Sequence, residues 1–335
     1  MREMKPEKEF VNGVQLCQTF YDQIVWPLLS REGFSNLMHS SGLLDAGSEV
    51  FGLDDVRSTD HHWGPRVLIF LNDTDHEKHA ADLKSVLGKK LPFEFMGYST
   101  NFGQPDEIGV QLLQPTAKRP INHRVQFFKV TSFFRHWLKN FDPTSKEITL
   151  EHWRSLPQQV LFAIRNGKLF RDDLNVESIR KKLWFYPKPI WIERLIHEWS
   201  KIEEEQAFVG RTGEVNDEIG SRVITARLVT SLMKIAFLLE REYYPYSKWF
   251  GTAFSRLETA EQLEPHIMGA LKAKDWRGRE QSLCNCYSVV IQRQNSIEGL
   301  PSVKLDISHF YNRPFRVPHA ERIVETLRKE VSENI

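Results

Sequence analysis

A loop between two apolar segments carries the residue types best suited to phosphate and metal chemistry. Residues 43–71 read LLDAGSEVFGLDDVRSTDHHWGPRVLIFL, and short apolar runs typical of buried strands stand at both ends. A small turn such as Gly47-Ser48 after a strand exposes backbone N–H groups, and the serine hydroxyl adds another donor. Taken alone, Gly-Ser is usually an ordinary turn. In this loop it predicts a phosphate site, with Arg57 as a further nucleotide contact.

Asp60 comes just before the second apolar run, where it could begin a metal site. Alternate residues of a strand share one face, so positions 60 and 62 point the same way. Two carboxylates there could hold a pair of Mg²⁺ ions that bridge nucleotide phosphates and an attacking hydroxyl. Position 62 is His62, whose imidazole is a poor Mg²⁺ ligand. Either Asp60 works with Asp54 or Asp55, or the metal is softer, or the site is degraded. The candidate catalytic and metal-binding residues are therefore Asp60, His62 and Asp55.

A second metal interpretation uses the histidines of DHEKH, residues 75–79. His76 and His79 stand three apart and could share one face of a helix. The motif is not HExxH, so the start of a solvated helix is the preferred interpretation over a zinc site.

The elements that must position these residues change character along the chain. Strand-like runs with Pro and Gly between them, together with helical patterns at 7–32 and 75–88, predict a mixed α/β first part. The turn-rich stretch FDPTSKEIT, residues 141–149, marks the expected boundary, and helical periods dominate after it. We expect an α+β protein with domains at 1–145 and 146–335, the second a helical bundle.

Composition narrows the class of protein. The chain has 335 residues, a net charge of +1 and 3 cysteines, which is ordinary globular composition without a disulfide framework. The charged N-terminus does not resemble a signal peptide, and no uninterrupted apolar stretch suggests a membrane span. We therefore expect a cytoplasmic two-domain protein that does not bind membranes. The near-neutral charge makes nucleic acid an unfavoured partner.

The predicted helical domain offers cations and aromatic residues that could complete a nucleotide pocket. Arg211 and Lys248 could neutralise phosphate charge, and Tyr246 could stack on a base together with Tyr244 and Trp249. Core packing is the preferred interpretation of most of these aromatic residues.

Two charged groups of the same domain have simpler explanations. Three cations recur at every seventh position: Arg227, Lys234 and Arg241. This spacing predicts a basic line along one helix face. Pairing of these cations with glutamates is a simpler explanation of the line than nucleotide binding. The acids of GEVNDE could include a general base, but a helix cap is preferred: Glu214, Asp217 and Glu218.

Four stretches resemble one family. These are GSEVFGLDDVRSTDHHWGPRVLIFL, EEEQAFVGRTGEVNDEIGSRVITARLV, EREYYPYSKWFGTAFSRL and HFYNRPFRVPHAERIVETL, and the resemblance that they carry extends over roughly residues 10–330. They resemble domain-of-unknown-function family 4037. That family is grouped with nucleotidyltransferase-like proteins and is similar in outline to the aminoglycoside nucleotidyltransferases.

The resemblance implies an N-terminal nucleotidyltransferase-like mixed sheet with flanking helices and a C-terminal helical domain. By this resemblance Gly47 and Ser48 match the phosphate turn and Asp60 the first metal carboxylate, while His62 stands where the second is expected. The third acid has no clear match: Glu94 and Glu107 are possible, while Gln126 stands at a position where an acid would be expected.

Two functions remain open. The first is transfer of a nucleotidyl group from ATP or another nucleoside triphosphate to a hydroxyl-bearing acceptor. It would use Mg²⁺ or Mn²⁺ at a cleft between the domains. The second is a nucleotide sensor or binding module without catalysis.

Overall fold

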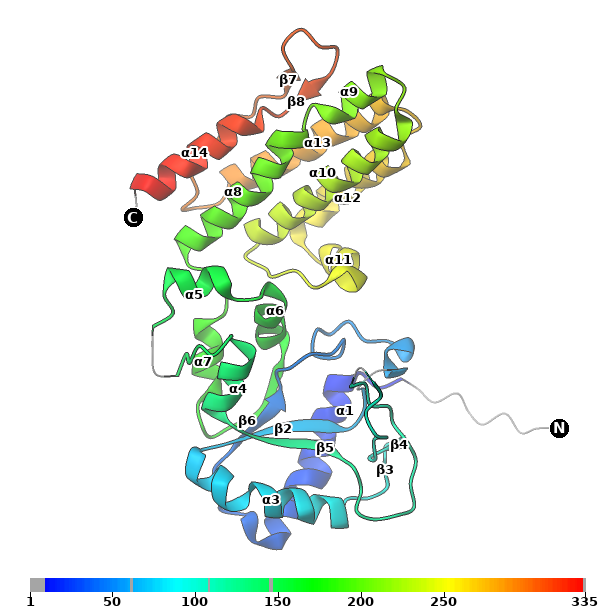
Figure 1. The fold of residues 1–335 in the computed structure, drawn as a ribbon, viewed down its shortest axis with the longest axis vertical. Helices are drawn as coiled ribbons and strands as arrows, with labels where there is room; N and C mark the ends of the chain where they lie inside the picture. Colours follow the sequence, from blue (N-terminus) through cyan, green and yellow to red (C-terminus); the bar gives the residue numbers. More distant parts are fainter. Residues whose placement is uncertain (1–9, 61–62, 108, 145–146, 334–335) are drawn as a thin grey trace, which may run out of the picture. The chain divides into compact units, whose positions relative to one another are not determined.

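The computed structural model describes residues 10–60, 63–107, 109–144 and 147–333. The chain divides into two compact units, residues 1–184 and 185–335 (Figure 1), and each is described by itself. The expected α+β class is confirmed, with a small mixed sheet in the first unit and helices throughout most of the second.

The first unit is built on a four-stranded sheet in the order β5-β2-β1-β6. Strand β1 (Ser40–Leu43) pairs antiparallel with both β2 (Arg66–Leu71) and β6 (Lys168–Asp172). Strand β2 pairs in parallel with β5 (Arg124–Lys129), which lies at one edge of the sheet. A separate short hairpin joins β3 (Glu94–Phe95) and β4 (Tyr98–Ser99).

Helices and helical turns surround this sheet. The segment from α1 (Gly13–Phe20) runs through π-helical turns and through α2 (Trp26–Leu29), and ends near Gly33, which has φ +97°. The others are α3 (Asp73–Lys90), α4 (Val130–Trp137), α5 (Leu150–Ser155), α6 (Gln158–Asn166) and α7 (Val176–Lys182). A 3₁₀ turn, η3 (Val56–Asp60), precedes β2.

The central strand β2 shows why this sheet forms. Every residue of RVLIFL is buried, as expected for a strand covered on both faces. Val67, Ile69 and Leu71 join the apolar cluster with α1 and α3. On the other face Phe70 packs edge-on against Phe133 of α4, with ring centroids 5.0 Å apart.

The first unit extends beyond the boundary expected between residues 145 and 146. The reason is strand β6, which pairs with β1 and so ties residues 158–182 to the sheet. Two glycines permit this pairing. A Cβ on Gly42 would lie 2.3 Å from the carbonyl oxygen of Lys168, and one on Gly167 would lie 2.3 Å from that of Leu43. The strands therefore approach too closely for any side chain at either position.

The second unit is helical apart from one short hairpin. Its helices are α8 (Lys188–Glu205), α9 (Phe208–Glu214), α10 (Glu218–Leu239), α11 (Ser247–Phe254), α12 (Glu258–Lys272), α13 (Trp276–Asn295) and α14 (Ala320–Glu333). Strands β7 (Ser308–His309) and β8 (Arg316–Val317) form the hairpin.

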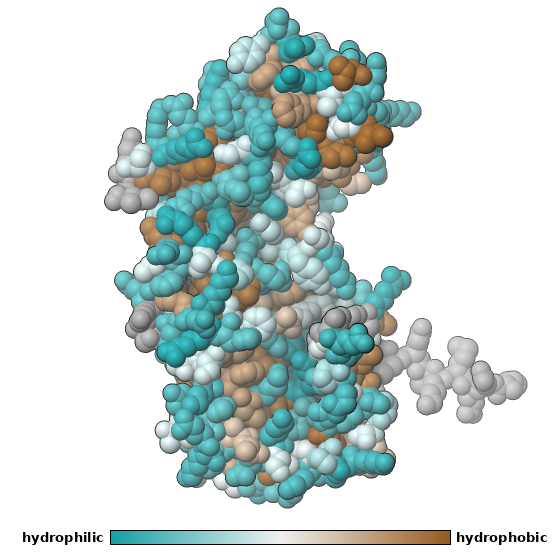
Figure 2. Space-filling model, viewed as in Figure 1, coloured by the Kyte–Doolittle hydropathy of each residue, from teal (hydrophilic) through white to brown (hydrophobic). Residues whose placement is uncertain are grey.

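Helix α10 is the centre of this unit. It packs against α8, α9, α12 and α13, while α14 packs on α8. Its sequence is apolar over much of its circumference, which suits a helix with neighbours on several sides. Figure 2 shows hydrophilic residues over much of the visible face of each unit. Within the described ranges, no helix has both the length and the apolar character needed to cross a bilayer.

Candidate functional site

The turn that follows β1 is closed by two backbone hydrogen bonds. The N–H of Val50 donates to the carbonyl of Gly47 at 3.1 Å, and that of Leu53 to the carbonyl of Ser48 at 2.9 Å. Gly47 has φ +148°, and a Cβ there would lie 2.5 Å from Oε2 of Glu49. This position therefore requires glycine, because a side chain would displace the Glu49 carboxylate.

Arg66, the first residue of β2, fixes this turn through hydrogen bonds from its buried guanidinium. It is only 2% exposed. Its Nη1 donates to both carboxylate oxygens of Asp45, at 2.7 and 2.6 Å. Its Nε and Nη2 donate to Oε1 of Glu49 at 2.9 and 2.7 Å, and Nη2 also donates to the carbonyl of Ala46 at 2.9 Å. One guanidinium thus holds three successive parts of the turn in a single arrangement.

The protonation of this cluster follows from its burial. Burial alone would lower the pKa of Arg66, but Asp45 and Glu49 raise it above its ordinary value. Burial raises the pKa of the Glu49 carboxyl, and Arg66 opposes that rise. Arg66 therefore stays charged at any working pH, with two carboxyl groups around it.

Several donors of the turn are left for a ligand. Among the described residues, no acceptor faces the backbone N–H groups of Gly47 and Ser48 or the Ser48 hydroxyl. Both residues are half-buried. The Ser48 hydroxyl is not fully enclosed, so water can reach it. These three adjacent donors are therefore open to water or to an anion.

Arg124 adds a second guanidinium beside the first. It is the β5 residue paired with Arg66 of β2, and its guanidinium lies 5.6 Å from the ring centre of Phe102. Burial lowers the pKa of Arg124, and the neighbouring charge of Arg66 lowers it further. The carboxylates of Asp45 and Glu49 act on its pKa in the opposite direction. Sequence reasoning missed both arginines, although each is a charged residue at the head of a strand.

The predicted metal residues are placed only in part. Asp60 ends the 3₁₀ turn η3, but its side chain and the residues His61 and His62 lie outside the described part of the structure. Asp55 is exposed and caps η3, with its Oδ1 accepting from the N–H of Arg57 at 2.8 Å and of Ser58 at 3.1 Å. Arg57 is exposed on the same turn. The metal site remains a prediction.

Asp54 has a structural role. Its Oδ1 accepts from Asn12 at 2.7 Å, and its Oδ2 accepts from the N–H of Gly13 at 2.7 Å and from the indole of Trp63 at 3.0 Å. It therefore joins the loop to the N-terminus of α1, where a carboxylate is favourable. With both oxygens engaged, Asp54 is the weaker of the two acids considered as partners for Asp60.

The positions considered for a third acid are scattered. Glu94 lies in the β3–β4 hairpin, Glu107 in a turn, and Gln126 on β5 beside Leu68 of β2. The described residues include no group of three or more His, Cys, Asp or Glu side chains that could hold a metal ion.

The histidines of the 75–79 segment contact different parts of the first unit. Helix α3 begins after Asn72, whose side chain accepts from the N–H of Asp75. His76 makes a 3.3 Å hydrogen bond with the carbonyl of Phe127, whereas the His79 ring packs edge-on against Phe34. The structure does not bring the two rings to a common partner.

The candidate nucleotide residues of the second unit lie at two ends of α10. Arg211 is on α9, which packs near the start of α10, while Tyr246 and Lys248 follow its end (Figure 1). With 22 residues at ~1.5 Å each, α10 is ~33 Å long. Arg211 and Lys248 are therefore too far apart to contact the same bound triphosphate.

The side chains at these positions have local contacts. The Arg211 guanidinium lies over the Phe208 ring and the Lys248 amine over the Trp249 ring. Tyr246 is 48% exposed and precedes α11. Tyr244 instead packs against Phe237 and Phe250, which confirms the core interpretation for that residue.

The cations predicted to form a basic line on α10 are near glutamates, as the pairing explanation expects. Arg227 pairs with Glu205 at 2.6 Å, and Lys234 lies 4.0 Å from Glu198. The expected continuation to Arg241 is wrong in its geometry, because α10 ends at Leu239 and Arg241 has φ +55°. Its guanidinium lies over the ring of Trp191 instead.

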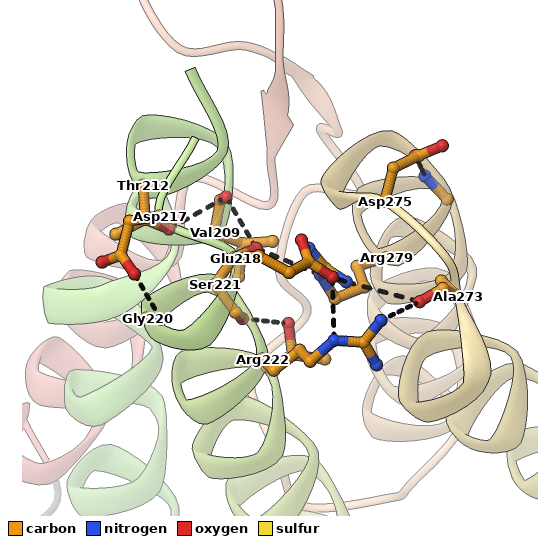
Figure 3. Close-up of polar contacts among 12 residues, drawn as sticks. Val209, Thr212, Asp217, Glu218, Gly220, Ser221, Arg222, Ala273, Asp275 and Arg279 are labelled. Atoms are coloured by element: carbon orange, nitrogen blue, oxygen red, sulfur yellow. Dashed lines mark hydrogen bonds and ion pairs between the residues drawn. The ribbon is translucent and has the colours of Figure 1, made fainter. Parts of the chain in front are cut away.

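The acids of GEVNDE also act as structural groups (Figure 3). Asp217 caps α10, with its side chain accepting from the N–H of Gly220 at 2.8 Å, which confirms the helix-cap interpretation. Glu218 accepts from the buried Arg279 and from Arg222 at 2.8 Å. Glu214 lies 3.4 Å from Arg313. The Glu218–Arg279 pair joins the start of α10 to α13, and Glu214 joins the end of α9 to the loop between β7 and β8.

Comparison with known proteins identifies one family segment. The model of the family described as "Domain of unknown function (DUF4037)" matches residues 153–250. This segment runs from α5 in the first unit to α11 in the second and includes the EQAFVGR and YYPYSKWF stretches. No curated protein matches the chain. The family match supports the resemblance over this segment.

Proposed function

We propose that the first unit binds the phosphates of a nucleoside triphosphate at the Gly47-Ser48 turn and transfers its nucleotidyl group to a hydroxyl acceptor. The observation that carries this proposal is the turn itself. Two backbone N–H groups and a hydroxyl have no partner among the described residues, and a buried arginine holds them in place. Donors arranged in advance stabilise an anion without reorganising when it binds.

Charge in this region supports a phosphate ligand. Arg66 is neutralised by Asp45 and Glu49, so it serves to position the turn. Arg124 is the adjacent guanidinium, and in this proposal it contacts a phosphate oxygen. The turn donors would hold the distal phosphates, where negative charge accumulates as pyrophosphate leaves.

The donor chemistry of the loop fits the implied metal. Asp60 and Asp55 would supply carboxylate oxygens, the ligands that Mg²⁺ and Mn²⁺ prefer. Asp60 ends the turn η3 before β2, and Asp55 directly precedes that turn. A bound metal would neutralise phosphate charge and lower the pKa of an acceptor hydroxyl. In the transfer, the acceptor oxygen bonds to the α-phosphorus, the bond to the bridging oxygen breaks, and its electron pair leaves with pyrophosphate. The hydroxyl proton passes to a base in the same loop.

A second candidate is nucleotide binding without transfer. It is favoured by Asp54, whose two oxygens are both engaged in holding α1 and Trp63. That leaves the loop with fewer carboxylates for a two-metal site. Such a protein would keep the phosphate turn and report nucleotide concentration.

Calorimetric titration with ATP, with and without Mg²⁺ or Mn²⁺, tests the shared part of both candidates. Arg124→Gln should weaken ATP binding about tenfold with or without metal, the expected loss of one charged hydrogen bond. Asp60→Asn should remove only the metal-dependent increase in affinity. Asp82→Asn, on the exposed surface of α3, is the matched control and should leave the affinity unchanged.

The products separate the two candidates. In the absence of an acceptor, water should replace it slowly and give AMP with pyrophosphate, not ADP with phosphate. A protein that binds ATP but releases neither pair is a binding module. Failure of the wild type to bind ATP under every condition would exclude both candidates.

A further inference from the structure

Several segments of the second unit meet at one end of its helices. The first turns of α10 reach the end of α12 through Arg222, whose Nη2 donates to the carbonyl of Ala273 at 3.1 Å (Figure 3). The end of α9 lies against the start of α13, because a Cβ on Gly213 would clash with the Trp276 ring. An ion pair from the end of α9 ties the loop between β7 and β8 to the same place. We call these segments the bundle tip, and they comprise residues 213–223, 268–277 and 310–313.

Large apolar side chains protrude from the bundle tip. Tyr311 is 85% exposed, Ile219 is 78% exposed and Val215 is 73% exposed. Three more are 38–49% exposed: Val223, Met268 and Leu271. Figure 2 shows hydrophobic residues gathered on the visible face of this part of the second unit. Apolar surface of this kind is typical of a contact with another protein or with a membrane.

These side chains come from two helices and two turns. Ile219 and Val223 are four residues apart on α10, and Met268 and Leu271 are three apart on α12, so each pair shares a helix face. Val215 lies in the turn between α9 and α10, and Tyr311 in the loop between β7 and β8. The cavities between α8 and α10 and between α12 and α13 are lined by other residues. The bundle tip is therefore a set of protruding side chains on separate segments.

The charges of the bundle tip are divided between engaged acids and free cations. Its acids act as helix caps or in ion pairs within the fold: Glu214, Asp217, Glu218 and Asp275. Lys272 and Lys274 are exposed, and neither has an acidic partner within the part of the chain that the structure describes. Arg277 is also exposed, and its guanidinium lies over the Trp276 ring. The tip therefore offers positive charge to a partner, although the whole chain is close to neutral.

We propose that the bundle tip docks on the surface of an anionic lipid bilayer. Protruding apolar side chains enter the headgroup region while free cations meet anionic headgroups, and the two contributions add. Tyr311 suits this boundary because its ring is apolar and its hydroxyl is polar. A bilayer fits this surface better than a protein helix does, since a helix lies along one groove and these side chains stand on separate segments. Such docking needs no helix that crosses the membrane.

Sedimentation of the full chain with sucrose-loaded vesicles tests this proposal. The protein should bind vesicles of phosphatidylcholine with about one third phosphatidylserine, and should bind pure phosphatidylcholine at least about tenfold more weakly. Added salt should weaken binding to the anionic vesicles. Lys272→Glu with Lys274→Glu should reduce that binding at least about tenfold, because both cations then repel the headgroups. The matched control is Lys248→Glu, an exposed lysine beyond the far end of α10, which should change binding less than about twofold.

A fluorescent label tests whether the apolar side chains enter the bilayer. All three cysteines of the protein are buried, so a cysteine introduced at an exposed position takes the label selectively. Tyr311→Cys carrying nitrobenzoxadiazole should shift its emission to shorter wavelength when anionic vesicles are added, because the label then leaves water. The same label on Tyr246→Cys, at a tyrosine that is 48% exposed beyond the far end of α10, should show no shift.

Three results would overturn the proposal. They are no preference for the anionic vesicles, undiminished binding by the charge-reversed pair, and an unshifted label on Tyr311→Cys while the protein is bound. Analytical ultracentrifugation identifies another occupant. A dimer of the full chain that Ile219→Ser dissociates, without vesicle binding, would make the tip a contact between two copies. Should the charge-reversed pair fail to fold, Lys272→Gln with Lys274→Gln must show a smaller loss in the same direction.

Discussion

Arg66 in the first unit and Arg279 in the second are both buried, at 2% and 1% exposure, but their partners differ. Arg66 binds two carboxylates that are themselves 14% and 2% exposed, Asp45 and Glu49. Arg279 binds Glu218, which is 46% exposed, and also donates to the Ser221 hydroxyl and the Ala273 carbonyl. Water can replace the second set of contacts more easily than the first.

The two arginines therefore differ in what they hold: Arg279 holds helices together, whereas Arg66 holds a turn that could bind a ligand. The contacts of Arg279 end on helix caps and helix ends, so they hold three helices together and leave few groups for a ligand. Arg66 holds a turn whose outer donors have no partner in the described part of the chain. Buried charge beside unused donors is typical of a functional site, where local structure is maintained for something other than stability.

The largest expected effect is at Arg66. Arg66→Met leaves two buried carboxylates without their counter-ion and should lower the free energy of unfolding by about 3–5 kcal/mol. Urea denaturation followed by tryptophan fluorescence measures this change. Arg57→Met, on the exposed turn before β2, is the control and should cost less than about 0.5 kcal/mol. A small loss at Arg66 would mean that water reaches its carboxylates.

Gly47→Ala should have the next largest effect, because the added Cβ meets the Glu49 carboxylate in a backbone conformation that favours glycine. We expect a loss of about 2–3 kcal/mol and a weaker affinity for ATP. Gly52→Ala is the matched control, since Gly52 has φ +62° but open space around its Cβ position. It should cost only about 1 kcal/mol and leave ATP binding intact. Equal losses would show that backbone strain alone, and not the Glu49 contact, determines the outcome.

Arg279→Met should destabilise the protein less than Arg66→Met does. The substitution removes the hydrogen bonds from Arg279 to Ser221 and Ala273. Ser221 still bonds the carbonyl of Val209, and Ala273 still accepts from Arg222. We expect about 1–3 kcal/mol in the same urea measurement and no change in ATP affinity. A loss as large as that of Arg66→Met would remove the distinction between the two arginines.

The smallest expected effect is on the pH dependence of the unfolding free energy. It tests whether His123 or the Arg66 cluster takes up a proton as the pH falls. Burial lowers the pKa of His123 below its ordinary 6.5, so the unfolded chain takes up the proton first. The contribution of neutral His123 is complete above pH 6.5 and is lost as the pH falls toward the folded-state pKa. His123→Asn should therefore flatten the fall of the unfolding free energy below pH 6.5. His309→Asn, an exposed histidine of β7, should leave the fall unchanged. If Glu49→Gln flattens it instead, the Arg66 cluster itself titrates.

Much of the scaffold was predictable because its signals are local. The apolar run RVLIFL predicted a buried strand, and the helical spacing around Asp217 predicted a capped helix. The boundary near residue 145 was less accessible, since β6 has a polar sequence and its partner β1 lies far away in the chain. A strand that depends on a distant partner has no signal in its own residues.

The candidate site was predictable only in its turn. Gly47-Ser48 was identified because a small residue pair after a strand has a recognised use. The role of Asp54 was not, since nothing near it in sequence shows that Gly13 and Trp63 would bind its oxygens. A useful signal was present at Arg66, where an arginine stands directly before the apolar run of residues 67–71. Such a residue must find a carboxylate when buried, and the loop before it contains several.

The pairing of β1 with β6 has a consequence for synthesis on the ribosome. Strands β1 and β2 emerge early from the ribosome. Strand β6 follows β1 by roughly 125 residues, and translation of that length takes roughly ten seconds at usual rates. During that interval the outer side of β1 is an unpaired strand edge, a surface on which other nascent chains can pair. A fragment that stops at residue 145 would keep this edge open permanently. Shortened forms of the first unit should therefore extend through α7, so that β1 is paired on both sides and β6 is the edge strand.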